Sequence, residues 1–532
     1  MAWPKGDEVL SKLRALGARV GQRVDHPLGD PRELRRLVDE IPGDNALRAL
    51  DEVLGWLESL QGADDFPADR LYEAVSRLDD VAQRHLRRLT RDYLHALRLS
   101  GAEEQRLWEA SHGFWTVLAA GYERCLPSPG SKAKIADKKL PALTARLIVA
   151  LGGILKWQQF RYRVAPGELW QRLGAALLTA ESAGVATRAV SLNPGLPEVS
   201  SPQQEFVKVV AFHASSMDSL LPREIELAER LIAHFAAGLV FSEKATSDSV
   251  YWVDLVLAQP PRRLARMPVR ATPTQRFFKP GKAHAGIAAL LGDLERGDHD
   301  VSRDINLGGQ QDSKVLLPVL RHLAAHLAPV PPQRRHGRHR VKQRVIVLPG
   351  LNNALGAFSG HPPGHAAGAA MESWVVEDVS YGGFGAVLNA MSGEWLKIGA
   401  LIVVQPAGGT WRLGIVRRVQ RLDESVAHVG VETLDESVAH VGVETLAQMV
   451  QHADLIRRTA SSYVAIAGIP ALLIREDNEP GVIRAVMPSG SFDPRQVLDW
   501  SDAGQRVSLK PIECVEQGDD YDVARYRLGT LG

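Results

Sequence analysis

The stretch DVSYGGFG, residues 378–385, decides how the second half of this chain is interpreted. It lies between two apolar, β-branched runs, so it is expected to join two strands. Gly382 and Gly383 permit positive φ and a close approach of neighbouring backbone. Asp378 is expected at a strand end, where its carboxylate can accept two donors from one planar edge, and Ser380 can bond the backbone or a ligand. Taken by itself, the stretch also fits an ordinary β-turn with an Asx-type hydrogen bond.

Short strand-like segments fill the chain after residue 340. They are rich in β-branched residues and bounded by turn residues. The segments are RVIVL, SWVVEDV, ALIVVQ, WRLGIVRRV, AHVGVETL, PALLIRE and GVIRAVMP. We expect a small antiparallel β-barrel over residues 329–450, with a basic N-terminal arm, and a small β-rich unit over residues 451–532. In that last unit, EDNEPG at residues 476–481 is expected to form a hairpin turn.

The N-terminal half has the periodicity of amphipathic helices. From Leu71 to Leu97, apolar residues recur at three- and four-residue steps, with charged residues between them. Residues 1–240 are therefore expected to form an α-helical domain. Residues 241–328 alternate strand-like and helical pieces, and we expect them to continue the N-terminal module. The predicted fold class is a multidomain α+β protein.

A twelve-residue sequence, LDESVAHVGVET, occurs twice in tandem, at residues 422–433 and 434–445. A strand has one register in a closed sheet, because a slip of one residue inverts its faces. The repeat length is even, so either copy presents the same side chains to a core. We expect one copy to occupy the barrel and the other to lengthen a hairpin or loop out.

The composition indicates a globular protein without a global attraction to nucleic acid or anionic membranes. The chain has 532 residues, 45% of them hydrophobic and 23% charged, and a net charge of +1. Cys125 and Cys514 are too few and too far apart for a disulfide framework or a cysteine metal site, which favours a reducing compartment. The N-terminus lacks the pattern of a signal peptide, and the most apolar stretch, residues 147–157, is too short to span a bilayer. We therefore expect a cytoplasmic protein with no membrane span.

A cluster of cations precedes the first expected strand of the barrel. No acidic residue lies between Asp312 and Glu372, so these charges have no local partner. Arginine carries planar, forked donors that fit phosphate oxygens and can stack on a flat ring. The cluster comprises Arg334, Arg335, Arg338, Arg340, Lys342 and Arg344. It predicts an anion-binding arm, although a basic run alone also fits a solvated linker.

Together, these two signals resemble the PilZ domain. That family has an arginine pair spaced four apart, then a strand, then Asp-x-Ser-x-x-Gly within a five- or six-strand barrel. The matching residues are Arg334 and Arg338 in RRHGR, and Asp378, Ser380 and Gly383 in DVSYGG. The resemblance covers about residues 330–450. The insertion at 359–370, rich in glycine and histidine, departs from the family pattern and is expected to form a loop.

Two arginine pairs compete for the first half of this motif. Arg340 and Arg344 have the same four-residue spacing as Arg334 and Arg338. We prefer the earlier pair. In a strand that begins after Arg338, Val341, Val345 and Val347 would all lie on the same face, as the first strand of the barrel needs. If the strand begins later, the second pair grips the ligand.

The resemblance implies a receptor for the bacterial second messenger cyclic di-GMP, with no other cofactor. Arginines, including Arg335, would grip the phosphates and guanine faces, while Asp378 and Ser380 read a guanine edge. The resemblance implies binding without bond breaking, so no enzyme activity is expected. The helical region would then pass the signal to a protein partner. The alternative is a PilZ-like scaffold or adaptor that no longer binds nucleotide, since a fold alone does not fix a function.

Other candidate sites are weaker. His322 and His326 have the spacing of a helical metal pair, but the zinc-protease pattern needs Glu where Leu323 stands, so we interpret them as part of an amphipathic helix. Asp79 and Asp80 lie on a charge-rich helical face and are interpreted as solvated. A nucleic-acid function is not expected, because the basic arm lacks interleaved aromatic residues for stacking.

Overall fold

A computed structural model places most of the chain. It describes residues 26–530 except for 64–65, 96–99, 128–134, 193–198, 269, 298–304, 310–311, 334–336, 361–370, 390–394, 424, 435–449, 459–467, 476–478 and 503–504. The described residues form two compact units. The helical unit comprises those of Met1–Phe160, Ala165–Ser215 and Pro222–Pro331. The barrel unit comprises those of Arg161–Val164, Ser216–Leu221 and Pro332–Gly532.

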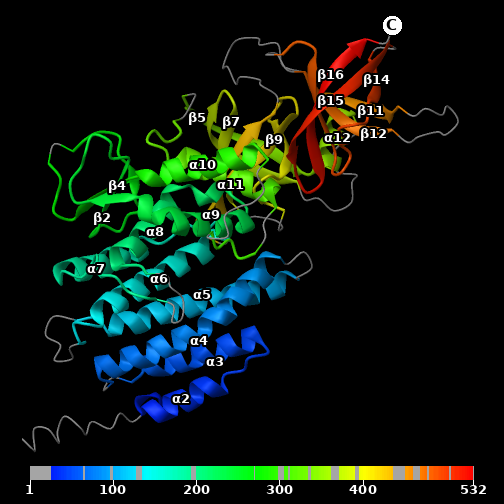
Figure 1. Ribbon diagram of the computed structural model, residues 1–532. Coiled ribbons are helices and arrows are strands. Elements are labelled where there is room, and N and C mark those ends of the chain that lie inside the picture. Colours follow the sequence, from blue (N-terminus) through cyan, green and yellow to red (C-terminus); the bar gives the residue numbers. More distant parts are fainter. Residues whose placement is uncertain are drawn as a thin grey trace, which may run out of the picture. The chain divides into compact units, whose positions relative to one another are not determined.

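Helices dominate the first unit. In Figure 1 the helices from α2 to α9 lie one above the next in successive layers. The described helices of this unit are η1 Pro27–Gly29, α2 Pro31–Glu40, α3 Ala46–Gln61, α4 Ala68–Leu94, α5 Gly101–Arg124, α6 Leu140–Gln159, α7 Gly167–Ser182, α8 Pro202–Ala214, α9 Pro222–Phe235, η3 Ala236–Gly238, α10 Lys282–Glu295 and α11 Ser313–His326. Local signals set several starts: α5, for example, begins with a capping box in which Ser100 and Glu103 each bond the other's backbone N–H.

A small antiparallel sheet belongs to the same unit. Its strands are β1 Val240–Ser242, β2 Tyr251–Asp254, β3 Arg262–Arg263 and β4 Gln275–Lys279, in the order β1-β4-β2-β3. Tyr251 of β2 stacks on Phe278 of β4 with ring centroids 4.9 Å apart, and both rings are buried. The Tyr251 hydroxyl also donates to the His326 carbonyl of α11 at 2.6 Å, which ties the sheet to a helix.

Helix α6 forms the centre of the helical unit. It packs against α5, α7 and α8, and most of its residues are buried. By length and composition its 20 residues could cross a membrane, and 78% of the apolar window is buried inside the protein, as in a core helix. The apolar stretch at 147–157 therefore belongs to a longer helix than the sequence indicated.

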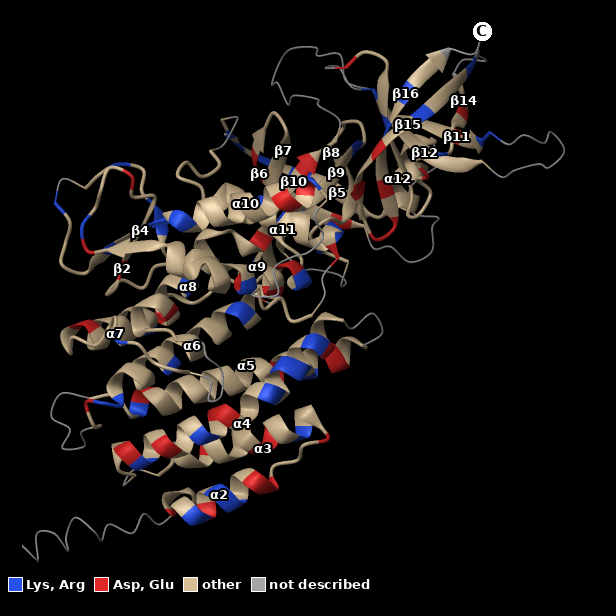
Figure 2. Ribbon diagram, in the orientation of Figure 1, with Lys and Arg blue, Asp and Glu red and all other residues tan. Residues whose placement is uncertain are grey.

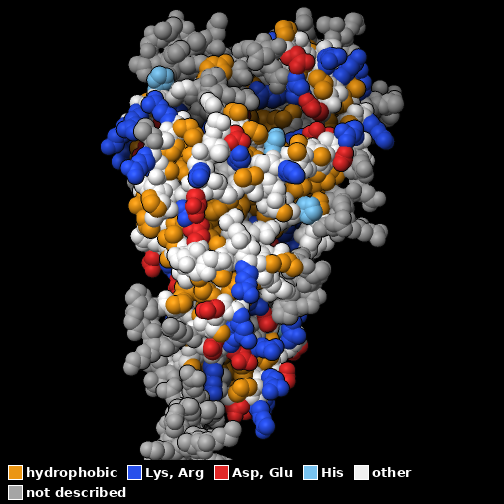
Figure 3. Space-filling model, turned by 60° about the vertical axis from the view of Figure 1, so that its left-hand side comes forward, with side chains coloured by type: hydrophobic (Ala, Val, Ile, Leu, Met, Phe, Trp, Pro, Cys, Tyr) orange, Lys and Arg blue, Asp and Glu red, His pale blue; other side chains and the backbone are white. Residues whose placement is uncertain are grey.

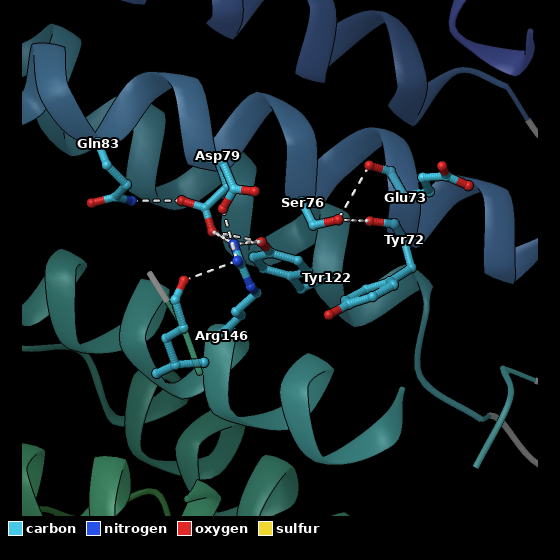
Figure 4. Close-up of polar contacts among 9 residues, drawn as sticks. Tyr72, Glu73, Ser76, Asp79, Gln83, Tyr122 and Arg146 are labelled. Atoms are coloured by element: carbon cyan, nitrogen blue, oxygen red, sulfur yellow. Dashed lines mark hydrogen bonds and ion pairs between the residues drawn. The ribbon is translucent and has the colours of Figure 1, made fainter. Parts of the chain in front are cut away.

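A buried polar network ties α4, α5 and α6 together (Figure 4). Asp79 on α4 accepts hydrogen bonds from the Tyr122 hydroxyl at 2.6 Å and from Arg146 Nη1 at 2.8 Å. Arg146 also reaches Asp80 through Nη2 at 2.7 Å. Burial raises the pKa of Tyr122 well above its usual value, so the phenol stays protonated and donates. The interpretation of Asp79 as solvated was wrong: its side chain is 8% exposed, because Arg146 lies against it.

The barrel unit begins with a closed six-stranded antiparallel barrel. Its strand order is β10-β7-β6-β5-β8-β9. The strands are β5 His339–Pro349, β6 Glu372–Ser380, β7 Gly383–Asn389, β8 Leu401–Pro406, β9 Arg412–Arg421 and β10 Val426–Thr433, and helix α12 Leu351–Phe358 follows β5. Each strand expected here from the sequence is present, and the α+β fold class is confirmed. The first copy of the tandem repeat supplies β10, whereas residues 435–445 of the second copy lie outside the described residues.

The C-terminal residues form a second closed barrel of six antiparallel strands. Its order is β11-β12-β13-β16-β15-β14. The strands are β11 Gln451–Arg457, β12 Ile469–Arg475, β13 Val482–Pro488, β14 Leu498–Asp502, β15 Gln505–Gln517 and β16 Tyr521–Thr530. The predicted small β-rich unit is thus a barrel with as many strands as the first. β12 and β13 pair antiparallel, and of the expected hairpin turn at 476–481 residues 476–478 lie outside the described residues.

The two barrels share one hydrophobic cluster. Leu348 and Leu401 of the first barrel pack with Leu472 and Tyr521 of the second, and Leu351 of α12 joins them. Polar contacts also cross this interface between the barrels. The Tyr521 hydroxyl donates to the Gly399 carbonyl at 2.8 Å. Because this cluster is buried on both sides, the barrels are expected to unfold together.

Two short segments from the helical part of the sequence belong to the barrel unit. Tyr162 and Val164 exchange backbone hydrogen bonds with Arg421 of β9, at 2.7 Å and 3.1 Å. Asp218 in η2 Met217–Ser219 is 8% exposed and accepts from Arg418 Nε at 2.6 Å. The Tyr162 hydroxyl donates to the Leu220 carbonyl at 3.1 Å, which joins the two segments to each other. We call residues 161–164 and 216–221 the junction segments.

Each junction segment contains a residue in a strained backbone conformation. Tyr162 has φ 56° and Ser216 has φ 52°. Positive φ is costly for a side chain with a Cβ and persists only where the surroundings hold it. The hydrogen bonds to β9 and the bond between the segments supply that restraint. The junction segments are therefore held parts of the barrel unit and not loosely attached connections.

Removal of the Asp79 carboxylate tests the buried network. Asp79→Ala leaves Arg146 buried with only Asp80 as a charged partner, so the helical unit should lose about 2–4 kcal/mol of unfolding free energy. Urea unfolding followed by helical circular dichroism measures the loss. Glu33→Ala removes an exposed partner of Arg36 on α2 and serves as the control, with no resolvable change expected. Equal stability of the two variants would contradict a structural role for the network.

Candidate nucleotide site on the first barrel

The turn between β6 and β7 positions the first half of the candidate site. In the β6–β7 pairing, Asp378 lies opposite Gly385, and Ser380 lies opposite Gly383. The Ser380 hydroxyl donates to the Gly383 carbonyl at 3.2 Å, so it closes the turn through its own backbone. A Cβ at Gly383 would come within 2.0 Å of the Val431 carbonyl oxygen on β10. Glycine at 383 is therefore required for β10 to pair here.

Arg338 contacts Asp378 across forty positions of sequence. Its Nη1 donates to Asp378 Oδ1 at 2.7 Å and to Oδ2 at 3.0 Å. The Arg338 and Asp378 side chains are 38% and 28% exposed. The two halves of the predicted motif therefore meet at a solvent-accessible position of the barrel.

The β5–β6 register places the other arginines. Arg340 lies directly opposite Asp378 and is exposed. Arg344 lies opposite Val375, three positions further along β6, which is about 10 Å from Asp378 along the strand. Arg338 and Arg340 thus lie at the carboxylate, whereas Arg344 does not. Arg334 and Arg335 lie outside the described residues.

Two irregularities in the strands lie at this position. The β5–β6 pairing shifts register between Arg340 and Gln343, and the β6–β7 pairing shifts between Val376 and Asp378. Each shift is a bulge, which bends a strand and redirects side chains. β6 alternates buried and exposed residues up to Val376, and after the shift Asp378 is partly exposed. The bulges thus help to bring a carboxylate to the surface from a strand that otherwise faces the core.

Sequence reasoning missed Gly385. A Cβ at this position would lie 2.9 Å from Asp378 Oδ1, so the glycine leaves the room that the carboxylate occupies. The signal was present, since Gly385 is the third glycine of the quoted stretch. Counting from the Ser380–Gly383 turn would have placed it opposite Asp378. Tyr381, at the tip of the turn, was also passed over; its side chain is exposed.

The turn connects to the second barrel through β10. Glu432 of β10 lies opposite Gly383 and accepts from Arg417 Nε at 2.6 Å. Nη1 and Nη2 of the same arginine donate to the two Glu516 oxygens, each at 2.7 Å. Burial disfavours the charge of Arg417, but the bonds to Glu516 and the charges of Glu516 and Glu432 raise its pKa overall. Arg417 therefore stays charged and links the strand beside the turn to β15.

The histidine pair on α11 has a structural explanation. The His322 ring contacts the Ser215 carbonyl, and His326 Nδ1 lies 2.9 Å from the His322 carbonyl oxygen. Their ring centroids are 4.1 Å apart. In the described part of the chain, no three His, Cys, Asp or Glu side chains gather closely enough to hold a metal ion.

Comparison with known proteins bears on the helical half. Residues 32–246 match the model of a family described as cyclic-di-GMP receptor FimW, N-terminal domain. The helical region is therefore similar to part of a cyclic di-GMP receptor. The match runs from α2 past β1 and does not include the barrels that carry Arg338 and Asp378. Among curated proteins, none matches this chain.

The family match supports the receptor expectation from a separate part of the chain. The expectation arose from residues 334–383, and the match lies wholly before them. The family description names a receptor and not an enzyme class.

Proposed function

We propose that this chain is a cyclic di-GMP receptor that binds the nucleotide on its first barrel, in the manner of a PilZ domain, and passes the signal to a protein partner. The observation that carries the proposal is the contact between Arg338 and Asp378 at the surface. A phosphate-binding cation and a guanine-binding carboxylate come together from two distant stretches of sequence. The family match to a cyclic di-GMP receptor supports the choice of ligand.

Each motif residue has a role that fits its geometry. Asp378 offers two carboxylate oxygens to the neighbouring N–H donors of a guanine edge. Arg338 uses Nη1 for Asp378, and a guanidinium carries five N–H donors, so others remain to bond a phosphate. Ser380 holds the turn closed, Gly383 lets β10 pair beside it, and Gly385 leaves room for the carboxylate.

The remaining arginines complete the proposed site. Arg334 and Arg335 lie just before Arg338 in sequence, and we assign them to the phosphates and the guanine faces. Arg340 is placed by register to assist, and Arg344 belongs to the alternative pair. The ligand carries two phosphate charges, and the basic segment contains no acid before Glu372, so binding should weaken as salt rises.

A second candidate function follows from the same ion pair. Arg338 already occupies the Asp378 carboxylate, so guanine has to share or displace that contact. If the ion pair is never opened, the barrel is a scaffold that binds other proteins without nucleotide. Direct titration separates the two candidates.

The junction segments offer a route from the barrel to the helical region. They bond to β9, which pairs with β10, and β10 lies beside the turn at Gly383. A ligand that shifts the turn would act on β10 and β9, and through these strands on residues 161–164 and 216–221. Those residues continue directly into the helices of the receptor-like region. We infer that this is how a partner bound by the helices senses the nucleotide.

Titration of the full chain with cyclic di-GMP in a calorimeter tests the binding proposal. The unchanged chain should bind, and Arg338→Ala should weaken binding by about 30- to 150-fold, or ~2–3 kcal/mol, because a charged, forked donor is lost. Arg344→Ala is the matched control, since it removes the same charge from β5 away from Asp378, and it should bind almost normally.

The two variants could also rank in the opposite order of affinity. Normal binding by Arg338→Ala, together with loss of binding by Arg344→Ala, would assign the site to the later arginine pair. No binding by the unchanged chain would support the scaffold.

Hydrogen exchange with and without cyclic di-GMP tests the route through the junction segments. The Val164 and Arg421 amides, which bond across the segment–β9 contact, should exchange more slowly in the bound state. Peptides from β12 and β13 in the second barrel provide the internal reference. Unchanged exchange at both amides, in a chain that binds the nucleotide, would rule out this route while leaving the binding site intact.

A further inference from the structure

The loop that joins β2 to β4 in the helical unit has an unusual composition. From Leu255 to Lys282 the sequence contains seven Lys or Arg residues and no Asp or Glu, in a chain whose net charge is only +1. We call residues 255–274 the basic arm. The arm lies outside the stretch that matches the receptor family, which ends at residue 246.

The arginines of the arm differ from those of the sheet behind it. Arg276 on β4 is buried against Glu181, and Lys279 bonds Asp248 at 2.6 Å, so these cations are neutralised within the fold. The four arginines of the arm are all exposed: Arg262, Arg263, Arg266 and Arg270. Figure 2 shows Lys and Arg along this loop, to the left of β2 and β4. The arm therefore presents positive charge to solvent.

Apolar side chains are exposed on the same arm. Val256, Leu257 and Met267 are 50%, 41% and 48% exposed. Met267 is adjacent to Arg266 in sequence, and Leu257 lies five positions before Arg262. Figure 3, in which this side of the molecule comes forward, shows a cluster of Lys and Arg side chains beside hydrophobic ones. The neighbouring Leu255, in contrast, is only 1% exposed.

The base of the arm is fixed. β3 pairs with β2 through Tyr251 and Arg263, and the Leu264 amide donates to the Val250 carbonyl at 2.8 Å. On the other side, the Leu255 amide donates to the Thr274 carbonyl at 3.0 Å. The exposed side chains are thus displayed from a paired sheet.

Three possible roles of such an arm require different residues. A basic edge strand prevents sheet aggregation, but that needs only the two arginines of β3 and leaves Arg266, Arg270 and Met267 unexplained. Single-stranded nucleic acid prefers aromatic platforms, and the arm sequence contains no aromatic residue. An anionic lipid surface attracts clustered arginines and accepts small apolar side chains between its headgroups. Of these three, the lipid surface is the one that uses both features of the arm.

We propose that the basic arm docks this chain on membrane surfaces that carry anionic lipid. The arginines bind headgroup phosphates, and Leu257 and Met267 enter the interface between headgroups and acyl chains. This contact is peripheral and needs no spanning helix. The proposal does not rest on the proposed nucleotide site, because its observations all come from the helical unit, whereas that site belongs to the barrel unit.

Vesicle co-sedimentation of the full chain without nucleotide tests the proposal. The chain should sediment with vesicles of phosphatidylcholine and phosphatidylglycerol, and remain in solution with phosphatidylcholine alone. The triple change Arg262→Glu, Arg266→Glu and Arg270→Glu should lower the apparent affinity by more than about a hundredfold, at roughly fivefold for each charge removed. Leu257→Ser with Met267→Ser should weaken the binding that persists in high salt, because this part depends on apolar insertion.

A matched control keeps the change of net charge constant. Arg32→Glu, Arg48→Glu and Arg77→Glu alter three exposed arginines of α2, α3 and α4, where acidic residues are interspersed, and should leave vesicle binding within about twofold of the unchanged chain. Circular dichroism confirms that each variant folds.

Three outcomes would overturn the proposal. One is a chain that ignores phosphatidylglycerol vesicles, and another is a control triple that loses as much binding as the arm triple. The third is binding to an immobilised polyglutamate peptide without binding to vesicles, which would assign the arm to an acidic protein partner.

Discussion

The contact between Arg338 and Asp378 is the interaction on which the proposed function depends. A carboxylate on β6 and a guanidinium just before β5 are forty residues apart, and the barrel brings them within hydrogen-bonding distance at its surface. The pairing of β5 with β6 sets this distance, and Gly385 on β7 leaves the space for the carboxylate. A ligand that needs a carboxylate for guanine and a cation for phosphate finds both at one point.

The rest of the barrel unit gives that point connections in two directions. Toward the C-terminus, Glu432 and Arg417 reach Glu516 of the second barrel, which also shares a hydrophobic cluster with the first. Toward the N-terminus, the junction segments bond to β9 and lead into the helices similar to the receptor family. The strained backbones of Tyr162 and Ser216 are maintained by these bonds. A small displacement of the turn therefore acts on packed, hydrogen-bonded strands and segments. These transmit a displacement better than a free loop does.

Local sequence information was sufficient for the strands and for the turn. The β-branched runs after residue 340 are strands because their side chains and bounding turn residues fit no other element, and the Ser380–Gly383 bond closes a turn over four consecutive residues. The preference for Arg338 rested on one parity for Val341, Val345 and Val347. Val345 and Val347 are buried in β5, whereas Val341 is half-buried and lies within the register shift between Arg340 and Gln343. The assignment of these residues to a ligand remains a prediction.

Features set by distant contacts could not be predicted in the same way. Asp79 falls in a charged helical pattern, and its burial depends on Arg146, which lies 67 positions away on another helix. The junction segments have no periodicity of their own, because their place is decided by β9. The bulges at Arg340 and Asp378 likewise arise from pairing between strands, which a single strand does not encode. Only Gly385 was within reach, by counting across the turn.

In the proposed site, Arg338 and Asp378 act on one and the same ligand. The most direct measurement is a double-mutant cycle, in which cyclic di-GMP affinity is determined for the unchanged chain, Arg338→Ala, Asp378→Ala and the double variant. We expect each single change to weaken binding, and the double change to cost at least ~1 kcal/mol less than the sum of the two. Losses that add within about 0.5 kcal/mol, or single variants that bind as well as the unchanged chain, would contradict it.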